Sequence, residues 1–221
     1  MKKQILLFAL IAISSAGFAQ SKISAGIRAG ISSSSMRGDA VDNLHNLLDF
    51  TNGAITTSGH TGFFGGANVS IPISEAISIE PGLYYTQKGY EMKGELGLKG
   101  VEFLGANAKA KLISNYVDVP LLMKVNLNGF EVFAGPQISY LAKADLKTTA
   151  GLLGFNLLNK TMDATDQFNR WDAAVTGGVG YQFPGGFNIS ASYDHGLSKV
   201  DANQNLESYN NSFKVGIGYR F

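Results

Sequence analysis

The sequence predicts an all-β protein: an eight-stranded antiparallel up-and-down transmembrane β-barrel, preceded by a cleaved signal peptide. Three observations favour this fold class. Apolar and polar residues alternate in eight segments, the links between these segments alternate between short and long, and the chain starts with an export signal. Glycine is frequent, at 27 of 221 residues, and only 16% of residues are charged. That composition disfavours a coiled coil, a helical bundle or a disordered chain.

The start of the chain has the three parts of a secretory signal peptide. Two lysines precede an apolar run at residues 5–13, and the small residues Gly17 and Ala19 follow it at a cleavage site. The run is too short to cross a bilayer as a helix, which needs about 20 residues. We expect residues 1–19 to be removed and residues 20–221 to form one outer-membrane β-barrel domain.

Alternation with a period of two marks each predicted strand. In the first segment isoleucine and alanine alternate with serine, glycine and arginine, and in the last, apolar residues alternate with lysine, glycine and arginine. Each segment is close to the 9–11 residues that a tilted membrane strand needs. The expected strands are residues 22–32, 61–71, 77–88, 113–125, 130–141, 171–183, 187–197 and 213–221.

The links between these strands alternate in length. Short links follow the second, fourth and sixth strands and suit tight hairpin turns. The other links are long, at residues 33–59, 89–112, 142–169 and 198–208. Short turns at one end and long loops at the other are typical of an outer-membrane barrel.

The two faces of the predicted strands differ in character. One face carries isoleucine, valine, leucine and phenylalanine, and we expect it to contact lipid because a closed barrel satisfies its backbone hydrogen bonds internally. The other face is mainly small or polar and points into the lumen. Its large exceptions are expected to fill the lumen: Tyr84, Tyr116, Phe133 and Leu141. Aromatic residues near strand ends predict interfacial girdles: Tyr140, Trp171, Phe183, Phe187 and Phe221.

Ionisable residues on the inner face nearly cancel in charge. Since buried charges need partners, we expect an internal salt-bridge network and a largely plugged lumen. The alternative is that this network selects a solute, although eight strands enclose an interior that their own side chains fill. The predicted network contains Arg28, Glu80, Lys88, Asp118, Lys124, Glu131, Asp172, Asp194, Lys214 and Arg220.

Several motifs resemble those of the PorT-like outer-membrane β-barrel family, in the same order along the chain. They are SIEPGLYYTQKG at residues 78–89, YVDVPLLMK at 116–124, FAGPQ at 133–137, YDHGL at 193–197 and GYRF at 218–221. Ser192 departs from the pattern, where an arginine is expected. The resemblance implies an outer-membrane barrel of a Gram-negative bacterium, and most members have no assigned activity. One namesake takes part in secretion and gliding, a role that this similarity does not carry over. Phe221 is similar to the C-terminal aromatic residue that the barrel-assembly machinery recognises.

Candidate chemistry is sparse. Asp194 and His195, with Ser192 and Ser198 nearby, raise the possibility of a lipid-active hydrolase, but adjacent residues of a strand point to opposite faces and form no relay. The chain has no cysteine, and its His, Asp and Glu residues lack metal-ligand spacing. We therefore expect no enzyme activity and no cofactor.

The long loops offer the best candidates for specificity. Residues 41–50 place four apolar side chains on one helical face, and residues 152–162 are similarly apolar. Such segments either bind a partner or pack over the barrel as a cap. The expected partners are outer-membrane lipid, the assembly machinery and a protein at the loops; a net charge of +1 gives no case for nucleic acid. The expected function is structural or interaction-based, with a narrow pore or small-solute barrel as the alternative and a lipid-active enzyme less favoured.

Overall fold

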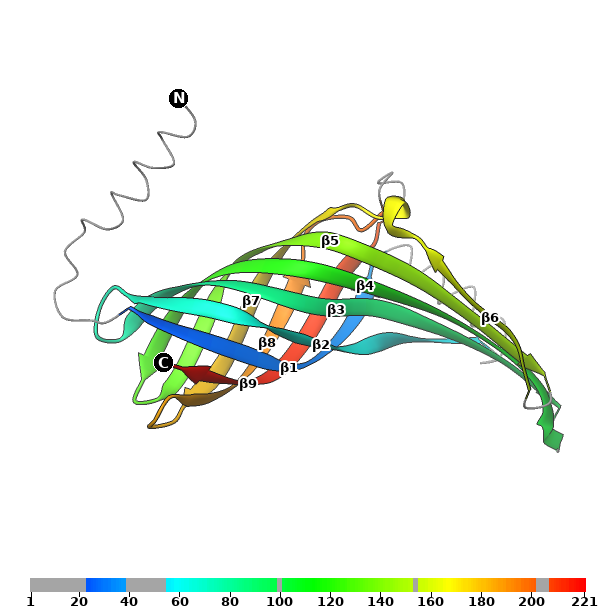
Figure 1. Cartoon of the computed structure of the whole chain (residues 1–221), viewed down its shortest axis with the longest axis horizontal. Helices are drawn as coiled ribbons and strands as arrows, with labels where there is room; N and C mark the ends of the chain where they lie inside the picture. Colours follow the sequence, from blue (N-terminus) through cyan, green and yellow to red (C-terminus); the bar gives the residue numbers. More distant parts are fainter. Residues whose placement is uncertain (1–22, 39–54, 99–100, 153–154, 202–206) are drawn as a thin grey trace, which may run out of the picture.

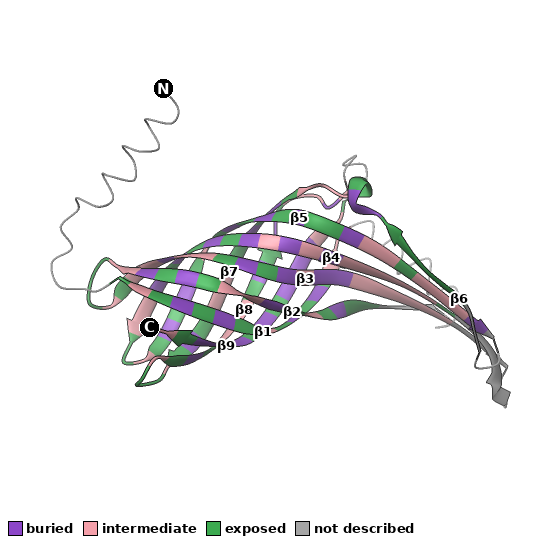
Figure 2. Cartoon of the chain, viewed as in Figure 1, coloured by how far each residue is buried: buried purple, intermediate pink, exposed green. Residues whose placement is uncertain are grey.

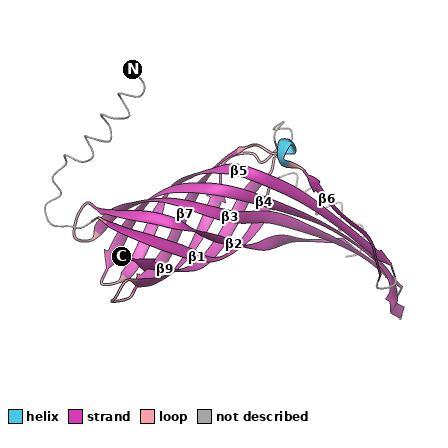
Figure 3. Ribbon diagram, viewed as in Figure 1, coloured by secondary structure: helices cyan, strands magenta, loops and turns pink. Residues whose placement is uncertain are grey.

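The computed structural model describes residues 23–38, 55–98, 101–152, 155–201 and 207–221, which form strands and one short 3-10 helix (Figures 1 and 3). The predicted signal peptide and the apolar pattern at residues 41–50 lie outside these ranges. No helix within them is long and apolar enough to span a bilayer. The elements are β1 (Ser24–Arg37), β2 (Ile55–Pro72), β3 (Ile77–Leu98), β4 (Val101–Leu127), β5 (Phe130–Leu152), β6 (Phe155–Asp163), η1 (Thr165–Gln167), β7 (Trp171–Gln182), β8 (Phe187–Gly196) and β9 (Tyr209–Arg220).

Eight of these strands close into an antiparallel ring. Each pairs with its neighbours in the order β1-β2-β3-β4-β5-β7-β8-β9, and β9 returns to pair with β1. In the closing pair, Arg28 lies opposite Gly218 and Ile31 lies opposite Val215. The predicted up-and-down barrel of eight strands is therefore confirmed.

Tight links gather at one end of the ring, which we call the turn end. Asn128 and Gly129 connect β4 to β5 with positive φ angles of 54° and 95°, the backbone shape that an Asn-Gly hairpin turn supplies. Gly185 and Gly186 make the link from β7 to β8 in the same left-handed region, with φ of 93° and 98°. The start of β1 and the end of β9 lie at this end as well (Figure 1).

At the opposite end, the loop end, the structure corrects the strand boundaries. Residues 89–112 and 142–169 were expected to be loops, but β3, β4 and β5 continue as strands through much of these segments, and β6 adds a ninth strand that pairs with β5. Beyond Tyr140, β5 leaves β7 and pairs with β6 instead. A five-stranded open sheet therefore extends past the barrel and curves away from it (Figure 1). We call it the outer sheet; it comprises residues 55–59, 89–98, 101–114, 142–152 and 155–163.

Within the barrel, burial alternates along most of each strand (Figure 2). Outward-facing apolar side chains are widely exposed, as in Leu83 at 58% and Ile217 at 58%, whereas the inward-facing residues are buried although many are polar. A soluble barrel would place its apolar residues inside. This arrangement matches a barrel surrounded by lipid.

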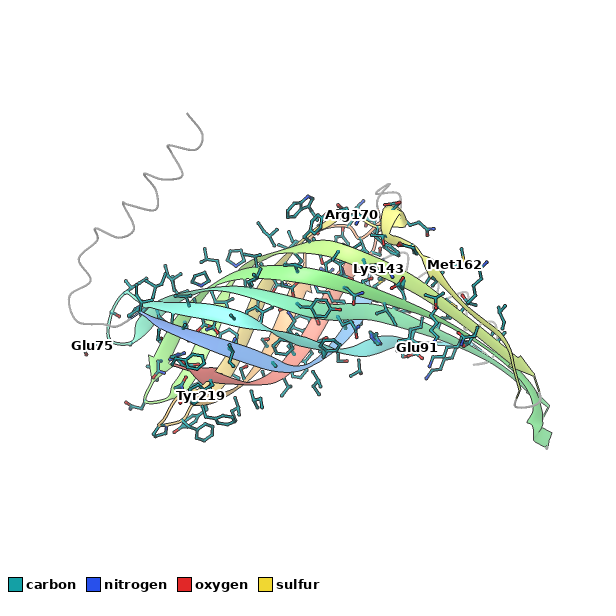
Figure 4. The ribbon with its side chains drawn as sticks, in the orientation of Figure 1. Glu75, Glu91, Lys143, Met162, Arg170 and Tyr219 are labelled. Atoms are coloured by element: carbon teal, nitrogen blue, oxygen red, sulfur yellow. The ribbon has the colours of Figure 1, made fainter. Side chains whose placement is uncertain are left out.

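The polarity of the two faces reverses where the barrel becomes the outer sheet. Lys93, Lys109 and Lys147 continue the outward face of their strands, while Tyr90 and Met92 continue the face that points into the lumen. Near the reversal, the Tyr85 hydroxyl donates a hydrogen bond to Asn115 Oδ1 at 2.7 Å. The outward face therefore changes from apolar to charged at this level. Glu91, Lys143 and Met162 mark the outer sheet in Figure 4.

Candidate functional site

The predicted lumen residues separate into two groups along the barrel axis. The group nearer the turn end, the turn-side cluster, consists of Arg28, Glu80, Lys124, Glu131 and Arg220. Glu80 lies 3.1 Å from Arg28 and 2.6 Å from Lys124. Glu131 lies 3.2 Å from Lys124 and 3.0 Å from Arg220, and Arg220 also reaches Glu80 at 3.7 Å. Three cations share two carboxylates, so this cluster has a net charge of +1.

The second group, the loop-side cluster, consists of Lys88, Asp118, Asp172, Asp194 and Lys214. Lys214 lies 3.0 Å from Asp118 and 2.7 Å from Asp194. Lys88 lies 3.4 Å from Asp172 and 3.8 Å from Asp118. Two cations share three carboxylates, so this cluster has a net charge of −1. Each of the ten residues is thus within 4 Å of an opposite charge, and the two clusters balance each other.

Apolar and aromatic side chains fill the lumen between the clusters. Phe64, Tyr84, Leu122 and Phe133 are all buried there. The two phenylalanines also contact the charges: Lys124 Nζ lies 5.7 Å from the Phe133 ring centre, and Lys214 Nζ lies 5.7 Å from that of Phe64. The cavity left among these residues is about 30 Å³, room for about two water molecules. The middle of the lumen is therefore nearly filled.

At the loop end, Tyr116 and Leu141 pack with Ala144 in a buried group. Lys88 Nζ lies 4.5 Å from the centre of the Tyr116 ring. The expectation that Tyr84, Tyr116, Phe133 and Leu141 fill the lumen agrees with their burial, since the most exposed of them is Tyr84 at 7%.

Sequence reasoning missed several neutral partners of the loop-side cluster. Thr176 Oγ1 donates to Asp194 at 2.9 Å, and Asn210 Nδ2 donates to Asp172 at 3.0 Å. Ser198 Oγ donates to the other oxygen of Asp172 at 2.8 Å. Alternation already placed Thr176 on the inner face. Asn210 precedes the segment in which alternation is clear. Extending the two-residue period back from Lys214 would have assigned Asn210 to the inner face.

The residues considered for hydrolysis do not meet. Asp194 points into the lumen and is buried, whereas His195 is exposed on the outer face and lies 2.9 Å from Arg37 Nη2. Ser198 contacts Asp172 rather than the histidine. In the described ranges, no group of three or more His, Asp or Glu residues is arranged to hold a metal ion.

Aromatic side chains lie at both ends of the lipid-facing surface. At the loop end, the Tyr140 and Trp171 rings are 5.1 Å apart in an edge-to-face arrangement. At the turn end, Phe183 and Phe187 are 5.6 Å apart, and Tyr219 packs against Phe221 at 5.2 Å. Figure 4 labels Tyr219 at this end. Two aromatic belts around an apolar band are typical of an outer-membrane barrel.

A closed antiparallel ring with an apolar outer surface and a charged interior defines a transmembrane β-barrel protein. Residues 18–202 match the family described as outer membrane protein beta-barrel domain, and the chain belongs to this family. The protein resides in the outer membrane of a Gram-negative bacterium, embedded in lipid, as the sequence predicted. No curated protein matches the chain.

Solved structures of other small outer-membrane barrels are similar to this chain. Ail, the attachment invasion locus protein of Yersinia pestis, has 15% identity and a TM-score of 0.45, with coverage of 91% of this chain and 100% of Ail. Neisserial surface protein A has 13% identity and a TM-score of 0.46, with coverage of 91% and 100%. OprG of Pseudomonas aeruginosa has 14% identity and a TM-score of 0.40, with coverage of 90% and 95%.

Proposed function

We propose that this protein is a structural or interaction barrel whose lumen is closed and whose outer sheet is the binding surface for an extracellular partner. The observation that carries the proposal is the reversal of polarity between barrel and outer sheet. The same strands that anchor the protein in lipid extend beyond the bilayer with an outward face that is charged.

The outer sheet has two different surfaces that a partner could use. Its outward face carries lysines that include Lys93, Lys109 and Lys147, with Glu91 and Asp145 between them. Its inward face is largely apolar, and Leu158 and Met162 on β6 are exposed at 46% and 50%. Exposed apolar residues beside charged ones are common where proteins bind one another.

The two charge clusters and the filled layer between them support a closed lumen. The alternative function, a narrow pore or a small-solute barrel, needs a continuous path that the buried Tyr84, Leu122 and Phe133 obstruct. Planar bilayers that contain the folded protein are expected to give no conductance above background. Discrete conductance steps would instead support the pore.

The proposal also covers the subgroup within the family, the domain bounds, the assembly signal and the absence of catalysis. The sequence motifs support a PorT-like member of the family, with residues 1–19 as the signal peptide and residues 20–221 as the barrel domain. Phe221, exposed at 72%, is proposed as the signal for the assembly machinery. No catalytic activity is proposed, because the lumen charges are paired with one another.

The interaction role can be tested on intact cells with a photo-crosslinking amino acid. Placed at Lys147, on the exposed outward face of the outer sheet, it is expected to give one defined crosslinked band. The control position is Ser74, an exposed residue in a turn-end link. Absence of a band at Lys147 and at Met162, with normal surface expression, would overturn the interaction role.

A further inference from the structure

The small cavity in the middle of the lumen is lined by polar groups as well as by aromatic rings. Arg28, Lys214 and Asp194 contribute charged groups to its lining, and Ser190 and Ser192 contribute hydroxyl groups. Its volume of about 30 Å³ has room for about two water molecules, and therefore also for one monatomic ion. Arg28 belongs to the turn-side cluster and the other two charged residues to the loop-side cluster, so the cavity lies where the clusters meet.

Two glycines keep aromatic rings of the lining against the barrel wall. Gly66 lies opposite Tyr84, and Gly178 lies opposite Phe133. A Cβ on Gly66 would lie 2.7 Å from the Tyr84 ring, and a Cβ on Gly178 would lie 2.6 Å from the Phe133 ring. Each ring thus packs on the backbone of a neighbouring strand. On β8, the small side chain of Ser192 stands where the PorT-like motifs predict an arginine. The cavity is the space that these residues leave.

Two buried hydrogen-bond donors belong to residues that line this cavity. Arg28 is 9% exposed and Tyr84 is 7% exposed. Within the described part of the chain, neither Arg28 Nε nor Tyr84 Oη has a hydrogen-bond partner. A guanidinium N–H can only donate, and a buried donor that is left unpaired is costly, more so when it is charged. Both groups therefore call for an acceptor in the cavity.

The charge of Arg28 is compensated only in part. Its ion-pair partner Glu80, at 3.1 Å, also contacts Lys124 at 2.6 Å, and the turn-side cluster has an excess of one positive charge. Among the described residues that line the cavity, two are cations and one is a carboxylate. That carboxylate, Asp194, already lies 2.7 Å from Lys214. A negative ion would supply both an acceptor and the missing charge, whereas a water molecule would supply the acceptor alone.

We propose that the lumen cavity is a binding site for one small monovalent anion of the halide class, represented by chloride. Arg28 Nε and the Tyr84 hydroxyl donate hydrogen bonds to the ion, and the Lys214 ammonium adds positive potential. The volume of the cavity selects a monatomic ion against larger anions such as phosphate. The ion serves as an internal counter-ion of the turn-side cluster. This site needs no conducting path and is independent of the interaction role proposed for the outer sheet.

The direct test is crystallographic and needs no variant. The folded protein is crystallised with sodium bromide in place of sodium chloride, and diffraction is recorded at the bromine absorption edge. An anomalous peak is expected inside the lumen, in contact with Arg28 Nε and Tyr84 Oη. Peaks confined to the protein surface would overturn the proposal and leave water as the occupant of the cavity.

The solution test measures whether chloride stabilises the folded barrel. Sodium gluconate is replaced by sodium chloride at constant ionic strength, and unfolding in urea is followed in lipid vesicles. An ion that binds only the folded state raises the folding equilibrium constant in proportion to its concentration once this exceeds the Kd. Since unfolding opens the lumen, the ion can enter without a channel. Equal stability of the wild type in chloride and gluconate would overturn the proposal.

A matched pair of variants locates the chloride effect. Tyr84→Phe keeps the ring and removes one donor, and about tenfold more chloride is expected to be needed for the same stabilisation. Tyr116→Phe makes the same change at a buried lumen tyrosine outside the cavity lining, and it is expected to respond like the wild type. General salt effects act on both variants alike.

The remaining outcomes also decide the matter. Both variants must retain heat-modifiable migration. The same chloride dependence in Tyr84→Phe and Tyr116→Phe would place the ion elsewhere and overturn this site. A bromide peak in the lumen without chloride-dependent stability would mean binding at crystal concentration only, which also overturns it.

Discussion

Lys214 on β9 lies 3.0 Å from Asp118 on β4, although these two strands are on opposite sides of the eight-stranded ring. Asp118 also faces Lys88 at 3.8 Å and is fully buried. The Asp118 carboxylate thus forms ion pairs with two lysines, one from the adjacent strand β3 and one from β9 across the barrel.

Removal of this carboxylate is expected to destabilise the barrel strongly. Asp118→Asn leaves both lysines with less compensation, and loss of one partner from a buried ion pair costs about 3–5 kcal/mol. The measurement is the free energy of unfolding in urea, in lipid vesicles. Glu75→Gln, at an exposed turn-end residue labelled in Figure 4, is the control and is expected to unfold like the wild type. Equal stability of Asp118→Asn and wild type would contradict the prediction.

Adjacent glycines on β2 are expected to differ in their tolerance of a methyl group. A Cβ on Gly66 would lie 2.1 Å from the Leu83 carbonyl oxygen and 2.7 Å from the Tyr84 ring, whereas a Cβ on Gly65 would meet nothing nearer than 3.6 Å. Gly66→Ala should therefore lower the free energy of unfolding by about 1–3 kcal/mol, the usual cost of overpacking. Gly65→Ala should be neutral or slightly stabilising, because alanine is less flexible in the unfolded chain. Urea midpoints of the two variants measure the difference, which a shared response would refute.

The single tryptophan reports the position of the loop-end aromatic belt. Trp171 is 60% exposed on the lipid-facing surface and packs edge-to-face on Tyr140. An interfacial position predicts stronger fluorescence quenching by lipids brominated near the carbonyl end of the acyl chain than by lipids brominated near the methyl end. The opposite order would place Trp171 in the middle of the bilayer and shift the proposed membrane boundary.

Acid is expected to loosen the outer sheet through Glu91. The Lys109 ammonium donates a hydrogen bond to this carboxylate and, with Lys93 and Lys111, holds the pKa of Glu91 below its ordinary value. A lowered pKa means that the contact stabilises the sheet above the ordinary pKa and is lost as pH falls through the lowered value. Once Glu91 is protonated, Lys93, Lys109 and Lys111 repel one another with no negative charge between them.

Hydrogen-exchange protection factors of the β3 and β4 amides beyond the barrel measure this effect. They are expected to fall between neutral pH and a pH below the ordinary pKa of glutamate, about 4.3. In Glu91→Gln they should be lower at neutral pH and should change little with acid. A pH profile that is the same in both proteins would exclude Glu91 as the cause.

The alternation of residue types was enough to predict which side chains face the lumen, including Tyr84 and Tyr116, since a strand has only two faces. It could not predict how the charges pair. Asp118 meets Lys214 because the barrel is tilted and sheared, and these parameters depend on the register of every strand pair. The separation into two clusters of opposite net charge is therefore a property of the closed ring.

The outer sheet escaped prediction for two physical reasons. In residues 89–94 the apolar side chains Tyr90 and Met92 continue the face assigned to the lumen, so the polarity expected of a membrane strand is inverted. In β5, Ala142 and Lys143 are both exposed at a bulge beside the register shift at Asn115, which changes the phase of alternation. The alternation that predicts a lipid-facing strand therefore ends at both places, although the strands continue.

The ion pairs also constrain the order of events during biogenesis. Arg28 meets Glu80, Lys88 meets Asp172 and Lys214 meets Asp118, and none of these pairs joins neighbouring strands. The Lys214–Asp118 pair crosses the ring from β9 to β4, so it forms only when the sheet has curled into the closed barrel. A sheet that entered hydrocarbon before closure would leave Asp118 without Lys214, and an uncompensated charge at mid-membrane costs about 2.5–3.5 kcal/mol. Closure before or during entry into the bilayer is therefore favoured over insertion of an open sheet.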